Sequence, residues 1–207
     1  MNTTLRRSGI AAMALGASLS LAACGSNDSS SSATDTTGGT TTGTASDAGA
    51  QTFGSGCAAV PKSGPGSFNG MATAPVASAA SANPALSTLV TAVTKAGLVD
   101  TLNSQKAITV FAPSNDAFGK IPPKTLKSVL ADKAVLTKIL TYHVVGQAVS
   151  PSELSTGNFE TLEKAKVTTS GTGEDYMVND AKVVCGNVKT ANATVYLIDS
   201  VLMPPTT

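Results

Sequence analysis

The chain has 207 residues, 13% of them charged and 4% aromatic, with a formal net charge of +1 at pH 7. This length accommodates one domain with additional segments, and the near-neutral charge gives no support to nucleic-acid binding, which ordinarily requires a basic patch. If Arg6 and Arg7 are removed with a signal peptide, 12 Lys and 13 acidic residues remain, and the formal charge becomes slightly negative.

Residues 1–23 have the organisation of a lipoprotein signal peptide. Arg6 and Arg7 give a positive start, and the apolar run that follows is too short to span a bilayer comfortably. Leu21-Ala-Ala-Cys24 resembles the bacterial lipobox, which implies that Cys24 receives a diacylglyceryl group and becomes the N-terminus. Two acyl chains suffice for stable membrane anchoring. The alternative is an ordinary secretion signal cleaved after an Ala-x-Ala-like site.

Residues 24–56 comprise the lipidated cysteine and a tether of Gly, Ser, Thr, Ala and Asp, in which Phe53 is the one large apolar side chain. Such a segment cannot bury enough apolar surface to offset its ordering entropy, so we predict a flexible tether. A Gly-rich coil of this length has an r.m.s. span of roughly 30 Å. Residues 57–207 then remain for one folded domain.

Cys57 and Cys185 remain once Cys24 carries lipid, which is an even number in an exported chain. They are the one pair that can form an intramolecular disulfide. The bridge closes a long loop, which chain-entropy models value at roughly 4–5 kcal/mol. The alternative, a reactive or metal-binding pair of thiols, lacks a neighbouring His or Cys.

Three helices are predicted before the strand-rich region that begins at Tyr142. Asn83 is a good N-cap, Pro84 a good first helical residue and Gly97 a good terminator. Two more helices are expected, one starting at Pro122-Pro123 and one capped by Asp132. Their lysines are expected to lie on a solvated surface, namely Lys124, Lys127, Lys133 and Lys138.

Residues 108–118, Ile-Thr-Val-Phe-Ala-Pro-Ser-Asn-Asp-Ala-Phe, predict a buried strand, a sharp corner and the start of a helix. Pro113 cannot continue the strand ladder because it lacks the backbone N–H group. Ser114 is the expected N-cap of the helix. We expect Phe111 and Phe118 to bury their rings on opposite sides of the corner.

From Tyr142 onward the pattern changes to short strands separated by Gly, Asn and Asp turns. The predicted strands are residues 142–145, 159–162, 166–169, 176–178, 182–184 and 194–203. A helical first half followed by a strand-rich second half predicts an α+β fold.

Three segments together resemble the sequence boxes of the fasciclin domain family: residues 108–118, Leu140–Val145 with its Tyr-His pair, and Ala193–Met203. They occur in the family's order. The contexts Gly56-Cys57-Ala-Ala and Val-Val-Cys185-Gly narrow the resemblance to the small secreted and lipid-anchored fasciclin antigens of mycobacteria and related actinobacteria. The resemblance implies a β-wedge of two small sheets with several helices along one edge.

No arrangement of residues predicts catalysis, a cofactor or a metal site. His143 is the single histidine, no Gly-x-Ser-x-Gly motif occurs, and a zinc site requires three or four ligands. Glycoside hydrolysis requires a pair of buried acidic residues. The acidic residues beside turns are expected to be exposed instead, namely Glu160, Glu163, Glu174 and Asp175. We therefore predict that the protein is not an enzyme.

Four residues are candidate partner contacts, each with a structural alternative. His143 is interpreted first as a hydrogen-bonded core or edge histidine that locks a turn. Tyr142 and His143 also match a segment implicated in adhesion by animal fasciclin domains, so the resemblance implies a contact role. Asn115 and Asp116 are expected to serve in the helix cap and turn, with partner contact as the alternative. Asn192-Ala-Thr fits the N-glycosylation pattern, which we expect to be idle here.

The sequence thus predicts a monomeric, non-enzymatic module, lipid-anchored on the extracytoplasmic face of the cell membrane. We expect it to mediate adhesion or bind another macromolecule, an unknown protein or polysaccharide, rather than nucleic acid. The alternative is a carrier of a small apolar ligand or glycolipid in the cell envelope.

Overall fold

The computed structural model describes residues 47–205. Cys24 and the signal residues lie outside this range, so their roles stay predictions. The helices are η1 (Ser55–Ala59), α1 (Phe68–Ala72), α2 (Val76–Ser81), η2 (Pro84–Leu86), α3 (Ser87–Ala96), α4 (Val99–Ser104), α5 (Asn115–Gly119), α6 (Pro123–Ala131), α7 (Lys133–Tyr142) and η3 (Pro151–Ser155). The strands are β1 (Ile108–Pro113), β2 (Val144–Val145), β3 (Thr156–Glu160), β4 (Lys166–Thr172), β5 (Asp175–Val178), β6 (Ala181–Lys189) and β7 (Ala193–Ile198). No helix in the described range is long and apolar enough to cross a bilayer.

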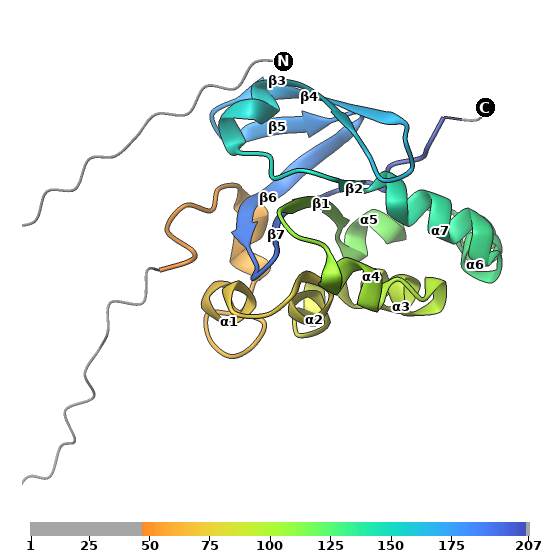
Figure 1. Ribbon diagram of the computed structural model, residues 1–207, viewed down its shortest axis with the longest axis horizontal. Coiled ribbons are helices and arrows are strands. Elements are labelled where there is room, and N and C mark those ends of the chain that lie inside the picture. Colours follow the sequence, from red (N-terminus) through yellow and green to blue (C-terminus); the bar gives the residue numbers. More distant parts are fainter. Residues whose placement is uncertain (1–46, 206–207) are drawn as a thin grey trace, which may run out of the picture. The chain divides into compact units, whose positions relative to one another are not determined.

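The strands follow one another in the order β2-β1-β7-β6-β5-β4-β3, so the α+β prediction is confirmed. The two expected small sheets are continuous, because the long strand β6 pairs with β7 on one side and β5 on the other. A bridge between Val145 and Thr161 brings the two ends of the order together, and the sheet is nearly closed. Helices α1 to α4 lie together on one side of β1 and β7, with β3, β4 and β5 on the other (Figure 1).

Strand alternation divides the interior into two apolar clusters. Successive side chains of a strand point to opposite faces. In β1, Val110 and Ala112 join the cluster beneath the helices, whereas Phe111 joins the cluster enclosed by the curled sheet. In β7, Leu197 faces the first cluster and Tyr196 the second. The two strands therefore form the shared wall of both clusters.

Residues 47–56, just before Cys57, belong to the folded part. Phe53 packs its ring edge against Tyr176, at 5.3 Å between centroids, and forms a backbone bridge with Gly186. A Cβ atom on Gly186 would collide with the Phe53 ring, so this contact requires glycine. The boundary predicted between residues 56 and 57 therefore falls too late, and the domain includes residues from Asp47 onward.

A disulfide joins Cys57 in η1 to Cys185 in β6. Cys185 is fully buried in the cluster beneath the helices, and its strand neighbour Gly186 carries the Phe53 contact. The bridge therefore fixes the N-terminal segment onto the strand at the centre of the sheet.

The local signals for helix ends and caps are confirmed, except that Asn83 caps the short turn η2, and α3 begins after it at Ser87 without a side-chain cap. Asn83 accepts a hydrogen bond from the Ala85 amide, Gly97 adopts the left-handed conformation, and Asp132 accepts bonds from two amides of α7. After residue 150 the predicted strands overlap β3 to β7. However, β7 ends at Ile198 rather than Met203, and the side chain of the next residue, Asp199, accepts a bond from the Lys182 amide.

Candidate functional site

The Tyr142–His143 pair lies at the end of a helix, not in the strand predicted for residues 142–145. Tyr142 is the last residue of α7, and His143 is its C-cap. The strand β2 begins only at Val144. The helix continues through Tyr142 because this side chain packs inward, 3% exposed, and its hydroxyl donates to the Lys166 carbonyl at 3.0 Å.

His143 ties three parts of the chain together through buried backbone bonds. Its ring is 2% exposed; Nδ1 donates to the Ile139 carbonyl at 2.8 Å, and Nε2 accepts from the Leu202 amide at 3.0 Å. This pairing requires the neutral ring with its proton on Nδ1, because an amide can only donate. Its own carbonyl accepts from the Phe111 amide. Neither ring nitrogen is free for proton transfer, and the Tyr142–His143 pair is not available to a partner in this position.

Burial lowers the pKa of His143 from 6.5 to about 4, and the hydrogen bond to the Ile139 carbonyl only partly opposes this shift. In the unfolded chain the ring binds a proton near pH 6.5, whereas the folded chain excludes it until about pH 4. The unfolded state therefore binds more protons throughout this interval. The free energy of unfolding must fall as the pH is lowered through it.

We expect acidification from pH 6.5 to pH 4 to cost about 3 kcal/mol of folding stability through His143. Urea unfolding followed by circular dichroism at several pH values measures this. His143→Phe should be less stable at neutral pH, because it strands the Leu202 amide, and its pH dependence above pH 4.5 should be nearly flat. An unchanged slope in the variant would assign the acid sensitivity to other groups.

The parallel pairing of β1 with β7 creates a surface groove. Pro113 pairs with Ile198, so the segments that leave both strands emerge side by side at the same edge of the sheet. The Ser114 amide donates to the Ile198 carbonyl at this point. Carboxyl ends of parallel strands are a frequent place for ligand sites. The groove has a volume of about 420 Å³ and is lined by Ser55, Gly56, Ala59, Ala85, Ser114, Asn115, Asp116, Lys120, Val184, Leu197 and Asp199.

The two candidate contact residues in this groove have different roles. The Asn115 side chain is occupied internally: its oxygen accepts from the Thr88 amide at 3.0 Å, and its nitrogen donates to the Pro84 carbonyl at 2.9 Å. Asn115 thus docks α5 on the start of α3. Asp116 lies in the first turn of α5 and is exposed. Within residues 47–205 it forms no ion pair.

A charged pair at the other end of the groove was not predicted from the sequence. Lys120 Nζ lies 2.8 Å from the Asp199 carboxylate. Partial burial alone would raise the pKa of Asp199, but hydrogen bonds from Lys120, the Lys182 amide and Ser200 outweigh it and lower the pKa. Asp199 therefore stays ionised and keeps Lys120 neutralised, which leaves Asp116 as the uncompensated charge of the groove.

Asn192, the acceptor of the glycosylation pattern, is a structural residue. Its oxygen accepts from the Val76 amide at 2.8 Å, and its nitrogen donates to the carbonyls of Leu102 and Gln105 at 2.8 and 2.9 Å. The side chain joins the turn between β6 and β7 to α2 and to the end of α4. A glycan on this nitrogen is incompatible with these bonds.

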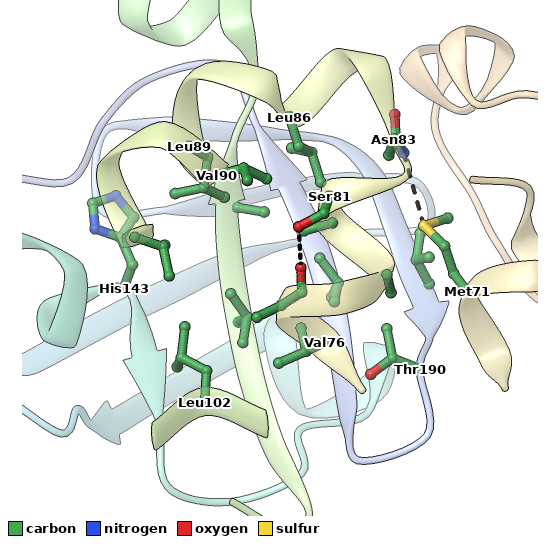
Figure 2. A pocket seen from close by; sticks show the side chains of 18 of the residues that line it. Met71, Val76, Ser81, Asn83, Leu86, Leu89, Val90, Leu102, His143 and Thr190 are labelled. Carbon is green, nitrogen blue, oxygen red and sulfur yellow. Dashed lines mark hydrogen bonds between the residues drawn. The ribbon is translucent and has the colours of Figure 1, made fainter. Parts of the chain in front are cut away.

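A second hollow lies beneath α2 and α3, and we call it the α2–α3 cavity. Figure 2 shows side chains from both helices directed into it, with His143 and Leu102 at its borders. Its volume is about 50 Å³, and its walls are almost entirely apolar. A void of this size costs roughly 1 kcal/mol of stability. It exists because α2 contributes small side chains, Ala77, Ala79 and Ala80, to its wall.

Within the described range, no three His, Cys, Asp or Glu side chains lie close enough together to hold a metal ion. The acidic side chains Glu160, Glu174 and Asp175 are exposed, as expected, and Glu163 is half-buried. The geometry thus offers a charged groove and an apolar cavity as candidate sites.

The fasciclin domain model matches residues 84–204, which include β1, the Tyr142–His143 pair and β7. The chain belongs to the fasciclin domain family. It is 50% identical to the cell surface glycolipoprotein MPB83 of Mycobacterium bovis over 173 residues, 80% of this chain and 78% of that protein. It is 51% identical to the immunogenic protein MPB70 of Mycobacterium bovis over 160 residues, 73% of this chain and 82% of that protein.

More distant members share the fold. The chain is 38% identical to protein sll1483 of Synechocystis over 128 residues, 61% of this chain and 71% of that protein. Among solved structures, a FAS1 domain pair from the insect cell adhesion molecule Fasciclin I superimposes with a TM-score of 0.50 at 23% identity. That match covers 60% of this chain and 47% of the insect chain, and it concerns the fold.

Proposed function

We propose that this fasciclin-family protein is a non-enzymatic module of the cell surface that binds another protein through the groove at the ends of β1 and β7. The names of the mycobacterial relatives, a cell surface glycolipoprotein and an immunogenic protein, support a surface location. Anchoring by a diacylglyceryl group on Cys24 and a monomeric state belong to the same proposal.

The exposed carboxylate of Asp116 is the observation that carries this function. It stands in a groove of about 420 Å³, within the range of sites that hold part of a partner molecule. The neighbouring Lys120 is already paired with Asp199, so the groove presents a net negative charge. A Lys or Arg side chain of a partner complements this charge. The part of the lining that the structure describes contains no aromatic side chain, and this favours a protein over a polysaccharide as the partner.

We expect Asp116→Asn to weaken partner binding about tenfold or more while leaving the fold intact, because it removes the unpaired charge but keeps the side chain's shape. Full-length protein, wild type or variant, is immobilised, and the binding of cell-envelope proteins is measured at low and high salt. Asp100→Asn, an exposed acid of the first turn of α4 that lies outside the groove, is the matched control.

Binding that is salt-sensitive, lost in Asp116→Asn and kept in Asp100→Asn supports the groove. If Asp116→Asn binds as strongly as the wild type and Asp100→Asn, Asp116 is excluded as the contact. Binding that survives protease treatment of the envelope extract would instead favour a polysaccharide. Mass spectrometry of the protein from its native membrane tests the anchor: an unmodified N-terminus at another residue contradicts lipidation of Cys24.

A further inference from the structure

The α2–α3 cavity is separate from the groove and has a different chemistry. Of the described residues that line it, none is Asp, Glu, Lys or Arg, and His143 is held neutral by its two backbone bonds. The hydroxyls of Ser81 and Thr190 donate to the carbonyls of Ala77 and Ala193. The walls therefore favour an uncharged, mainly apolar occupant, since burying an unpaired charge there is strongly unfavourable.

One polar group at the cavity is only weakly satisfied. Asn83 is 1% exposed, and its oxygen accepts from the Ala85 amide at 3.0 Å. Among residues 47–205, the sulfur of Met71 is the only partner of its nitrogen, at 3.8 Å, and a thioether is a weak acceptor. Figure 2 shows this amide and Met71 together at one end of the cavity. A carbonyl oxygen placed there would be a better acceptor.

The volume limits the size of the occupant. About 50 Å³ is the space of roughly three to five water-sized groups, at about 10–15 Å³ each on this measure, which matches the carbon and oxygen atoms of an acyl group of two or three carbons. The cavity comes nearest to the surface beside α2 and α4, because Ser81 is exposed and Val99 is half-buried while both line it, and we expect an occupant to enter there.

We propose that the α2–α3 cavity binds a short, uncharged acyl group carried as an ester, with the Asn83 amide donating to its carbonyl oxygen. The apolar tail of the group fills the void left by Ala77, Ala79 and Ala80. This site goes beyond the groove and does not depend on its function. The end of a long fatty chain is apolar like a short acyl group but is larger. Binding measured with acyl groups of increasing length therefore distinguishes a short acyl group from a long fatty chain.

The test uses full-length protein labelled with carbon-13 at its Leu and Val methyl groups and followed by NMR spectroscopy. It is titrated with four methyl esters, namely methyl acetate, methyl propionate, methyl butyrate and methyl octanoate. The expected result is a saturable shift of the methyl signals of Leu89 and Val110 with propionate ester, and none with propionate ion. Octanoate ester should bind no more tightly than butyrate ester. An affinity that increases steadily from the acetate to the octanoate ester would contradict the proposal that the cavity binds a short acyl group.

Two variants assign the site. Ala80→Leu should abolish the shifts by filling the cavity, whereas Ala165→Leu, a half-buried alanine of the other cluster, should keep them. Asn83→Ser keeps an N-cap oxygen but removes the amide donor, and it should weaken ester binding roughly three- to tenfold. If Ala80→Leu does not fold, Ala79→Val serves as the filling variant. Ester binding that is unchanged in both a folded filling variant and Asn83→Ser would overturn the proposal.

Discussion

Reduction of the Cys57–Cys185 disulfide should lower the free energy of unfolding by about 4–5 kcal/mol, at least about a third of the stability of an ordinary domain. The bridge closes a loop with a sequence separation of 128 residues, so breaking it greatly increases the conformational freedom of the unfolded chain. In the folded state, reduction also frees η1 from β6. Urea unfolding with and without a phosphine reductant measures the change.

The matched control is the double variant Cys57→Ala/Cys185→Ala, which should have the stability of the reduced protein and should not respond to reductant. Hydrogen exchange should show the largest loss of protection around Phe53 and Gly186, whose backbone groups bond to each other. A loss of less than 1 kcal/mol would mean that the Phe53 contacts hold the segment without the bridge.

Phe118→Ala should cost about 3–5 kcal/mol, because it removes a large side chain from the cluster beneath the helices. Phe118 is 7% exposed, and Phe111 is fully buried in the other cluster, so the two rings lie on opposite sides of the Pro113 corner as predicted. Loss of the Phe118 ring leaves α5 without its main apolar contact. Thermal and urea unfolding with the disulfide intact measure the effect.

Asp116→Ala is the internal control for this measurement, since it lies on the same helix but is exposed. Its cost should be about 1 kcal/mol, the value of a carboxylate in the first turn of a helix. If Asp116→Ala is as unstable as Phe118→Ala, Asp116 takes part in a buried network, and its assignment to a partner would lose its basis.

The features that depend on neighbouring residues were predictable from the sequence. Ser114, Asn83 and Asp132 cap helices because a short polar side chain can reach an amide two or three residues away. The Pro113 corner follows from the missing amide of proline. The apolar faces of α3 and α7 follow from helical spacing.

Features that depend on distant pairing were not predictable. Lys120 meets Asp199 only because β1 and β7 pair in parallel, and no local signal marks that pairing. The Tyr142 error arose because an aromatic residue beside β-branched ones is typical of a strand. In the sequence Phe53 is an isolated apolar residue in a polar segment, because the residue against which it packs, Gly186, lies far along the chain. The α2–α3 cavity likewise results from how small side chains meet across elements.

The position of β7 between β1 and β6 determines when this domain can fold during synthesis and export. Ile108 pairs with Ala193, and no part of β1 finds its main partner until the last strand has emerged. Before that moment both β1 and β6 present open edges, which invite aggregation. Cys57 must also wait for Cys185. The chain is therefore expected to leave the cell interior as an unfolded, export-competent polypeptide and to acquire its structure only after its C-terminal end has crossed.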